Sequence, residues 1–169
     1  MEPLFENTHT QDKSFYKEIY GYFYLRRPVA IGFYVFSAVG FLIHLPLAIS
    51  GRDQSIGFMA LAIALPLINL ILYFRHIRLS ARRNNEISSE PISVSTFVHE
   101  NSLELTASNG STINIELSKI RSAVQTKNYI VLRSDARLLY SFHKDGFTKG
   151  TKEDFLAFLK GKGIKISGK

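Results

Sequence analysis

Two long apolar runs without a charged residue constrain this chain most. Residues 28–50 read PVAIGFYVFSAVGFLIHLPLAIS and residues 54–74 read QSIGFMALAIALPLINLILYF. A helix of about 20 residues crosses the hydrocarbon core of a bilayer. The runs therefore predict a transmembrane helical hairpin over residues 28–74, in preference to two core helices of a soluble protein. A cleaved signal peptide is disfavoured because the first run exceeds the usual apolar region of about 15 residues and a second run follows it.

Basic residues predict the orientation of this hairpin. The short connection between the runs carries one arginine, Arg52, beside Asp53, whereas the outer flanks carry arginines alone. An excess of Lys and Arg marks the cytoplasmic side of a membrane. We therefore expect a multi-pass plasma-membrane protein with both termini in the cytoplasm. The flanking basic residues are Arg26, Arg27, Arg75, Arg78, Arg82 and Arg83.

Two further segments lie next to the predicted hairpin. In the N-terminal segment, residues 1–27, the first eleven residues are polar and are expected to be poorly ordered. Residues 12–26 have helical periodicity with aromatic side chains around most of the helix, which favours a helix at the headgroup boundary. The alternative is that this helix docks against the cytoplasmic domain. Residues 75–90 are expected to form a basic juxtamembrane linker.

From residue 91 onward apolar and polar residues alternate, as in β-strands. The Asn109-Gly110 pair predicts a tight hairpin turn. Thr151 is the expected N-cap of a final amphipathic helix that buries Phe155, Phe158 and Leu159. The expected fold class is therefore α+β: a membrane hairpin plus an antiparallel β-meander domain, residues 91–169, capped by a C-terminal helix. The predicted strands lie near residues 92–98, 103–107, 113–117, 120–126, 129–134 and 138–142.

The β-rich segment also resembles a known family. The hairpin from Val98 to Leu117, the run LSKIRSAVQTKNY from Leu117 to Tyr129, and the phenylalanine-containing C-terminal helix are similar to the YcxB-like family of bacterial membrane proteins. The upstream segment that ends in Arg26-Arg27-Pro28 is similar as well. Members often carry a Trp ahead of the lysine-containing turn, where this chain has Leu117. The resemblance implies a small pleckstrin-homology-like domain in the bacterial inner membrane, and it brings no catalytic residues.

No pattern in the sequence predicts catalysis, a cofactor or a metal site. The chain has no Cys, and its histidines lack the helical spacing of metal ligands. His99 and His143 could meet across the sheet, but ordinary surface positions are favoured. His44 and Asn69, the notable polar residues of the apolar runs, lie near opposite ends of the predicted hairpin and suit an interface better than a transport pathway. The expectation is a protein that is not an enzyme.

Charge gives the remaining indication of function. Residues 91–169 hold twelve Lys and Arg against seven Asp and Glu. The main hypothesis is a membrane protein whose cytoplasmic β domain binds an unknown protein partner or another copy of itself. One alternative is binding of anionic lipid, and a second is an accessory subunit of a transport or enzyme complex; nucleic acid is disfavoured as a partner. The basic residues expected to share one face, either solvated or in contact with lipid or a partner, are Arg121, Lys127, Arg133 and Arg137.

Overall fold

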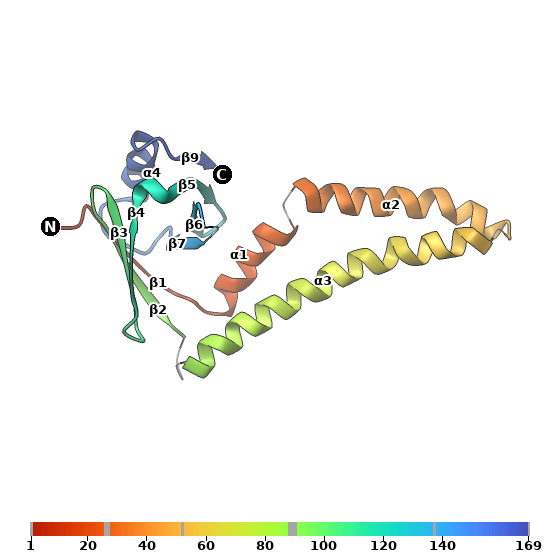
Figure 1. The fold of residues 1–169 in the computed structure, drawn as a ribbon, viewed down its shortest axis with the longest axis horizontal. Helices are drawn as coiled ribbons and strands as arrows, with labels where there is room; N and C mark the ends of the chain where they lie inside the picture. Colours follow the sequence, from red (N-terminus) through yellow and green to blue (C-terminus); the bar gives the residue numbers. More distant parts are fainter. Residues whose placement is uncertain (1, 26–27, 52, 88–90, 137, 169) are drawn as a thin grey trace. The chain divides into compact units, whose positions relative to one another are not determined.

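The computed structural model describes residues 2–25, 28–51, 53–87, 91–136 and 138–168 (Figure 1). The chain divides into two compact units. The β unit comprises Met1–Phe15 together with Arg83–Lys169, and the helical unit comprises Tyr16–Arg82. This division differs from the predicted one, because the start of the chain belongs with the β-rich segment.

Both apolar runs form long helices, as predicted. Helix α1 spans Lys13–Leu25, α2 spans Pro28–Ile49 and α3 spans Asp53–Ile87. Within α2 and α3, Ala30–Ile49 and Ser55–Ser80 are long and apolar enough to cross a membrane. Helix α3 continues well past the apolar run, so most of the expected linker over residues 75–90 is helical. Helix α2 and helix α3 each accommodate an internal proline, Pro46 and Pro66.

Helix α1 packs on the C-terminal half of α3 through hydroxyl and aromatic groups. The Tyr73 hydroxyl donates a hydrogen bond to the main-chain oxygen of Lys17 at 3.2 Å, and the hydroxyls of Tyr20 and Ser80 lie 2.9 Å apart. The ring of His76 lies 6.2 Å from that of Tyr20. The tyrosine side chains of α1 thus contact α3 of the same chain. The sequence pattern had favoured a position for this helix at the headgroup boundary.

Within the described residues the β unit contains two sheets rather than the single meander expected. Sheet A is five-stranded in the order β4-β3-β2-β1-β8, and sheet B is four-stranded in the order β7-β6-β5-β9. All neighbouring strands are antiparallel except β5 and β9. The strands are β1 Phe5–Thr10, β2 Ser93–Val98, β3 Ser102–Ala107, β4 Thr112–Glu116, β5 Ile120–Gln125, β6 Tyr129–Ser134, β7 Leu139–His143, β8 Phe147–Lys149 and β9 Lys165–Ser167.

The prediction that residues 1–11 are poorly ordered is wrong. Residues Phe5–Thr10 form β1, which lies inside sheet A between β2 and β8. Its register against β2 runs from Phe5 opposite Val98 to Thr10 opposite Ser93, and the amide of Gln11 donates to the oxygen of Ile92 at 2.8 Å. The three helices are therefore inserted between two adjacent, paired strands of one sheet.

The core of the β unit lies where the inner faces of the sheets meet the C-terminal helix. Helix α4, Lys152–Gly161, begins at the predicted N-cap, where the Thr151 hydroxyl accepts a hydrogen bond from the amide of Asp154 at 3.1 Å. Phe155 is fully buried, with its ring centroid 4.6 Å from that of Phe142 and 5.5 Å from that of Phe5. The predicted β-rich domain with a C-terminal helix is thus confirmed, and β1 completes its core.

Candidate ligand-binding surfaces

The four basic residues predicted to share a face are distributed differently in the structure. Arg121 is exposed on β5 and Arg133 is half-buried on the adjacent strand β6. Lys127 lies in the turn at the far end of the β5–β6 hairpin, about 16 Å from Ser122 at about 3.3 Å per residue. Arg137 lies outside the described residues. The structure therefore brings two of the four residues, Arg121 and Arg133, together.

A bulge in β5 explains why these two arginines meet. The register of β5 against β6 shifts between Ile120 and Ser122, so Arg121 is an additional residue on its strand. A bulge places two residues opposite one and re-aims a side chain. Arg121, Ser122 and Arg133 consequently line one hollow of about 380 Å³, together with Ser134 and Asp135. We call these five residues the bulge hollow.

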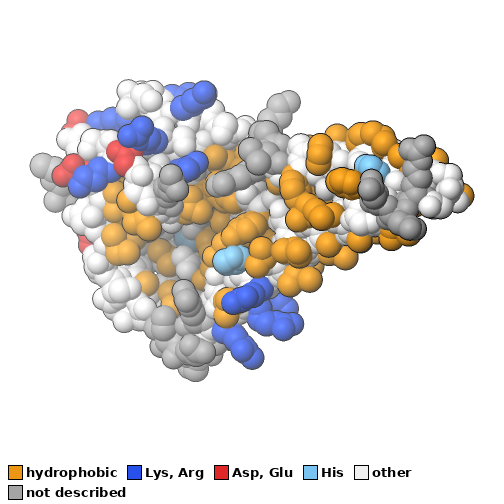
Figure 2. Space-filling model, turned by 45° about the vertical axis from the view of Figure 1, so that its right-hand side comes forward, with side chains coloured by type: hydrophobic (Ala, Val, Ile, Leu, Met, Phe, Trp, Pro, Cys, Tyr) orange, Lys and Arg blue, Asp and Glu red, His pale blue; other side chains and the backbone are white. Residues whose placement is uncertain are grey.

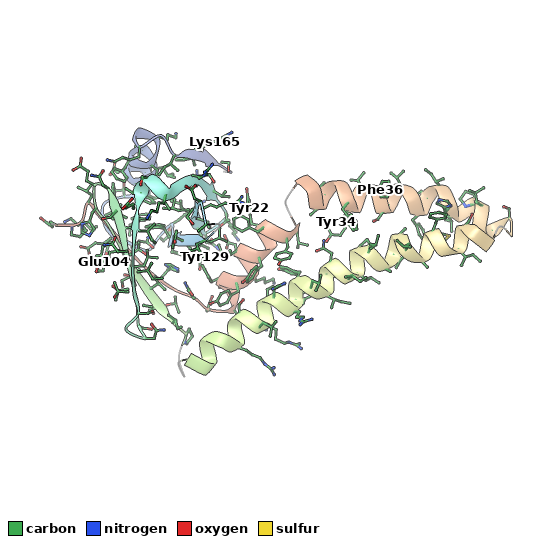
Figure 3. The ribbon with its side chains drawn as sticks, viewed as in Figure 1. Tyr22, Tyr34, Phe36, Glu104, Tyr129 and Lys165 are labelled. Carbon is green, nitrogen blue, oxygen red and sulfur yellow. The ribbon has the colours of Figure 1, made fainter. Side chains whose placement is uncertain are left out.

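The net charge of the bulge hollow is positive, which favours the binding of anions. The Nε of Arg121 pairs with a carboxylate oxygen of Asp135, while the Arg121 side chain stays 76% exposed. The second arginine, Arg133, is not involved in that pair. On the other side of β5, the parallel pairing with β9 brings Lys165, which is labelled in Figure 3, opposite Ser122. The sequence pattern does not indicate Lys165, because β9 has only three residues and shows no strand periodicity.

The juxtamembrane arginines follow the helix rather than a linker. Arg75, Arg78 and Arg82 are exposed along the end of α3. Arg26 and Arg27 lie outside the described residues, as does the side chain of Arg83. Their predicted role beside the headgroups stays a prediction.

A second surface feature is an apolar groove on the β unit. It has a volume of about 350 Å³ and lies between the inner face of β2–β4 and the start of β7. Leu138 and Ile113, one on each wall, are 56% and 53% exposed. In an antiparallel pair of strands, hydrogen-bonded residue pairs alternate with pairs that are not hydrogen-bonded. The amide of residue 107 donates to the oxygen of residue 111, so the pairs at Thr112, Asn114 and Glu116 are of the second kind. The main-chain groups of these three residues therefore point away from β3. The groove thus lies beside the edge strand β4, which pairs with β3 on one side and with no described strand on the other.

A buried polar layer joins the two sheets. The side-chain amide of Asn7 donates to the oxygen of His143 at 2.8 Å and accepts from its amide at 3.0 Å, replacing a pair of strand hydrogen bonds. Nearby, His9 Nε2 lies 3.0 Å from the Ser141 hydroxyl, and its Nδ1 is buried with no hydrogen-bond partner in the described chain. Tyr129 lies between the rings of His9 and His143. The structure therefore brings His143 close to His9, not to His99.

Burial makes His9 a source of pH-dependent stability. Desolvation, followed by the nearby His143, lowers the pKa of His9 to about 4, below the value of about 6.5 expected in an unfolded chain. Between these pH values the unfolded chain binds more protons, so stability falls as the pH falls. We expect the β unit to lose about 2 kcal/mol between pH 7 and pH 5 through this group. Urea unfolding of the full chain in detergent micelles, followed by circular dichroism, measures this loss.

The matched variant for this measurement is His9→Gln, which keeps an amide near Ser141 and removes the titrating group. Its unfolding free energy should change less than that of the unmodified chain over the same pH range. Equal pH dependence in the two proteins would contradict the assignment to His9.

No group of three or more His, Cys, Asp or Glu residues that could hold a metal ion occurs within the described ranges. Of the other histidines, His99 Nε2 lies 3.9 Å from a carboxylate oxygen of Glu104, and the His44 ring stacks on Phe58 at 4.8 Å. These contacts pair each histidine with one neighbour. They assemble no further site.

Comparisons with known proteins return no relative. No protein-family model, no curated protein and no solved structure matches the chain.

Proposed function

We propose that this chain is an integral protein of the bacterial cytoplasmic membrane, with a non-catalytic, pleckstrin-homology-like β domain that binds a protein partner or a second copy of itself. The resemblance to the YcxB-like family is part of this proposal. Two packed sheets closed by a C-terminal helix support the comparison with pleckstrin-homology-like domains. The observation that carries the binding function is the apolar groove beside the free edge of β4.

The surface of the helices supports the membrane part of the proposal. Hydrophobic side chains cover the outside of the helices (Figure 2), and Phe36 and Ile49 are 77% and 80% exposed. Soluble proteins rarely leave continuous apolar patches of this kind in water, whereas a hydrocarbon environment accommodates them. The arginines along the end of α3 support an orientation with that end, and with it both termini, on the cytoplasmic side.

Labelling of introduced cysteines tests this topology, because the chain contains no native Cys. Ser50→Cys, next to the connection between α2 and α3, should react with a membrane-impermeant thiol reagent in intact cells. Lys160→Cys, on α4, should react only after the cells are permeabilised. The reverse pattern would contradict the orientation, and labelling of both in intact cells would contradict a cytoplasmic β domain.

The groove is suited to an extended protein segment. A free strand edge offers main-chain donors and acceptors, and adjoining pockets accept alternate side chains of an added strand. On β4 these groups lie at Thr112, Asn114 and Glu116, while the side chain of Ile113 lines the groove. The opposite, outer face of sheet A is polar, with the hydroxyls of Thr8 and Ser95 3.1 Å apart. The apolar face of the β4 edge is therefore the proposed binding surface.

Photo-crosslinking from two neighbouring positions tests this surface. A benzophenone attached to Ile113→Cys should form a discrete adduct in membranes, and the same group on Asn114→Cys, which points to the outer face, should not. A product at twice the 19.1 kDa of the chain identifies self-association. Leu138→Asp on the facing wall should abolish the adduct. Equal adducts from the two positions, adducts that persist in the Leu138 variant, or no adduct at all would overturn the proposal.

A further inference from the structure

We infer that the bulge hollow binds a phosphate group, held by Arg121, Arg133 and the Ser122 hydroxyl. This site is separate from the apolar groove, and it adds a ligand to the proposed interaction function. The phosphate belongs either to a lipid headgroup or to a soluble phosphate compound, since both present the same chemistry to the hollow.

The arginines supply the main attraction. Guanidinium groups match phosphate oxygens bidentately, and hydrogen bonds to charged groups are stronger than neutral ones. Arg121 and Arg133 line the same hollow from adjacent strands, so a single anion can contact both. The β5 bulge makes this possible, because Arg121 is the residue added to its strand.

Asp135 reduces the positive charge but also orients Arg121. It binds the Nε of Arg121 and leaves the two terminal nitrogens with no hydrogen-bond partner in the described chain. Asp135 itself is fixed by its amide, which donates to the oxygen of Lys119 at 3.0 Å. With one carboxylate against two guanidinium groups, the hollow retains a net charge of one positive unit.

The flanking residues extend the same surface. Ser122 lies opposite Arg133 on one side and opposite Lys165 on the other. The three side chains consequently form a row across β6, β5 and β9, with a hydroxyl between two cations. A hydroxyl can donate to a phosphate oxygen, and a Lys ammonium adds a mobile point charge at the rim.

Three lysines elsewhere on this unit are engaged by neighbouring oxygen atoms. Lys144 Nζ donates to the oxygen of Thr126 at 2.6 Å, and Lys152 lies 3.1 Å from Glu153. Lys149 pairs with Glu2. In the bulge hollow, by contrast, two guanidinium groups line one concave surface.

Phosphate binding is tested on the full chain in non-ionic detergent micelles. Inorganic phosphate should raise the thermal unfolding temperature relative to chloride at equal ionic strength, since a ligand of the native state stabilises it. The double variant Arg121→Gln/Arg133→Gln should weaken the apparent affinity at least tenfold, as expected for lost charge-assisted hydrogen bonds. Ser122→Ala should weaken it less. Lys127→Gln, a control that removes one positive charge from the far end of the same hairpin, should bind as the unmodified chain does.

The source of the phosphate is distinguished by native mass spectrometry of the same proteins with added phosphatidic acid or phosphatidylcholine. Retention of phosphatidic acid that is lost only in the arginine variant identifies a lipid headgroup. Unchanged lipid retention, with phosphate binding still lost in that variant, identifies a soluble ligand. No stabilisation by phosphate, or an equal loss in Lys127→Gln, would overturn the site. Neither result bears on crosslinking at the groove.

Discussion

Deletion of residues 1–11 is expected to unfold the β unit, although these residues lie far from the rest of it in the sequence. Strand β1 is internal to sheet A, so its loss leaves β2 and β8 without their shared neighbour. It also removes Phe5 from contact with Phe155 and opens the polar layer at Asn7. Proteins are stable by only about 5–15 kcal/mol, less than the loss of an internal strand costs. Circular dichroism and amide hydrogen exchange of the truncated chain in micelles measure the effect.

The same topology predicts a rescue. Because Gln11 and Ile92 are hydrogen-bonded neighbours, an Asn-Gly turn that replaces residues 12–91 should join β1 to β2 as a two-residue hairpin. This shortened chain should fold in water without detergent. The control is deletion of residues 2–3, which precede β1 and should leave the fold intact. A folded β unit in the chain without residues 1–11 would contradict the role of β1.

Gly150→Ala is expected to destabilise the β unit by about 3 kcal/mol. The residue has a φ of 77°, and an added Cβ would lie 2.4 Å from Cδ1 of Phe5. The left-handed backbone costs about 1 kcal/mol for alanine, and the collision adds about 2 kcal/mol. The Phe5 ring cannot move aside freely, since it packs 5.5 Å from the rings of both Phe155 and Phe158. Urea unfolding followed by circular dichroism gives the loss.

Gly163→Ala is the matched control, because Gly163 has the same φ of 77° and open space where a Cβ would lie. It should lose only the backbone contribution of about 1 kcal/mol. In a Phe5→Ala background the difference between the two glycine variants should disappear, which makes a double-mutant cycle. Equal losses at the two glycines in the unmodified chain would show that the collision with Phe5 is relieved without cost.

The sequence predicts strands well where apolar residues alternate, and poorly where polar residues occupy the inner positions. Strands β2 to β7 and the cap at Thr151 follow the expected pattern. Strand β1 was not predicted because two of its three inward residues, Asn7 and His9, are polar and form hydrogen bonds with residues of β7. Those partners are more than 130 residues away along the chain, so no local pattern reveals them. Strands β8 and β9 are too short to show a period.

The division of the strands into two sheets could not be predicted from the sequence either. Strand β6 is buried on both faces, with Ile130 and Leu132 in the main core and Val131 fully covered on the other side. A strand that is buried on both faces has a continuous apolar sequence, and this sequence does not show which elements cover each face. The candidate basic site was predicted in part, since residue type indicates charge but not position. The β5 bulge brings Arg121 beside Arg133, and it exists only in the pairing of β5 with β6. The residue types of β5 alone do not indicate it.

The insertion of three helices between β1 and β2 has a consequence for how the chain is made. During synthesis β1 emerges first, and its partner β2 emerges only after α3 is complete. In a membrane-inserted chain, the two strands reach the same compartment only when both helices of the hairpin have crossed. A chain with a single crossing leaves β1 and β2 on opposite sides of the bilayer and cannot close sheet A. In the proposed topology, completion of the β unit therefore depends on the crossing of both helices of the hairpin.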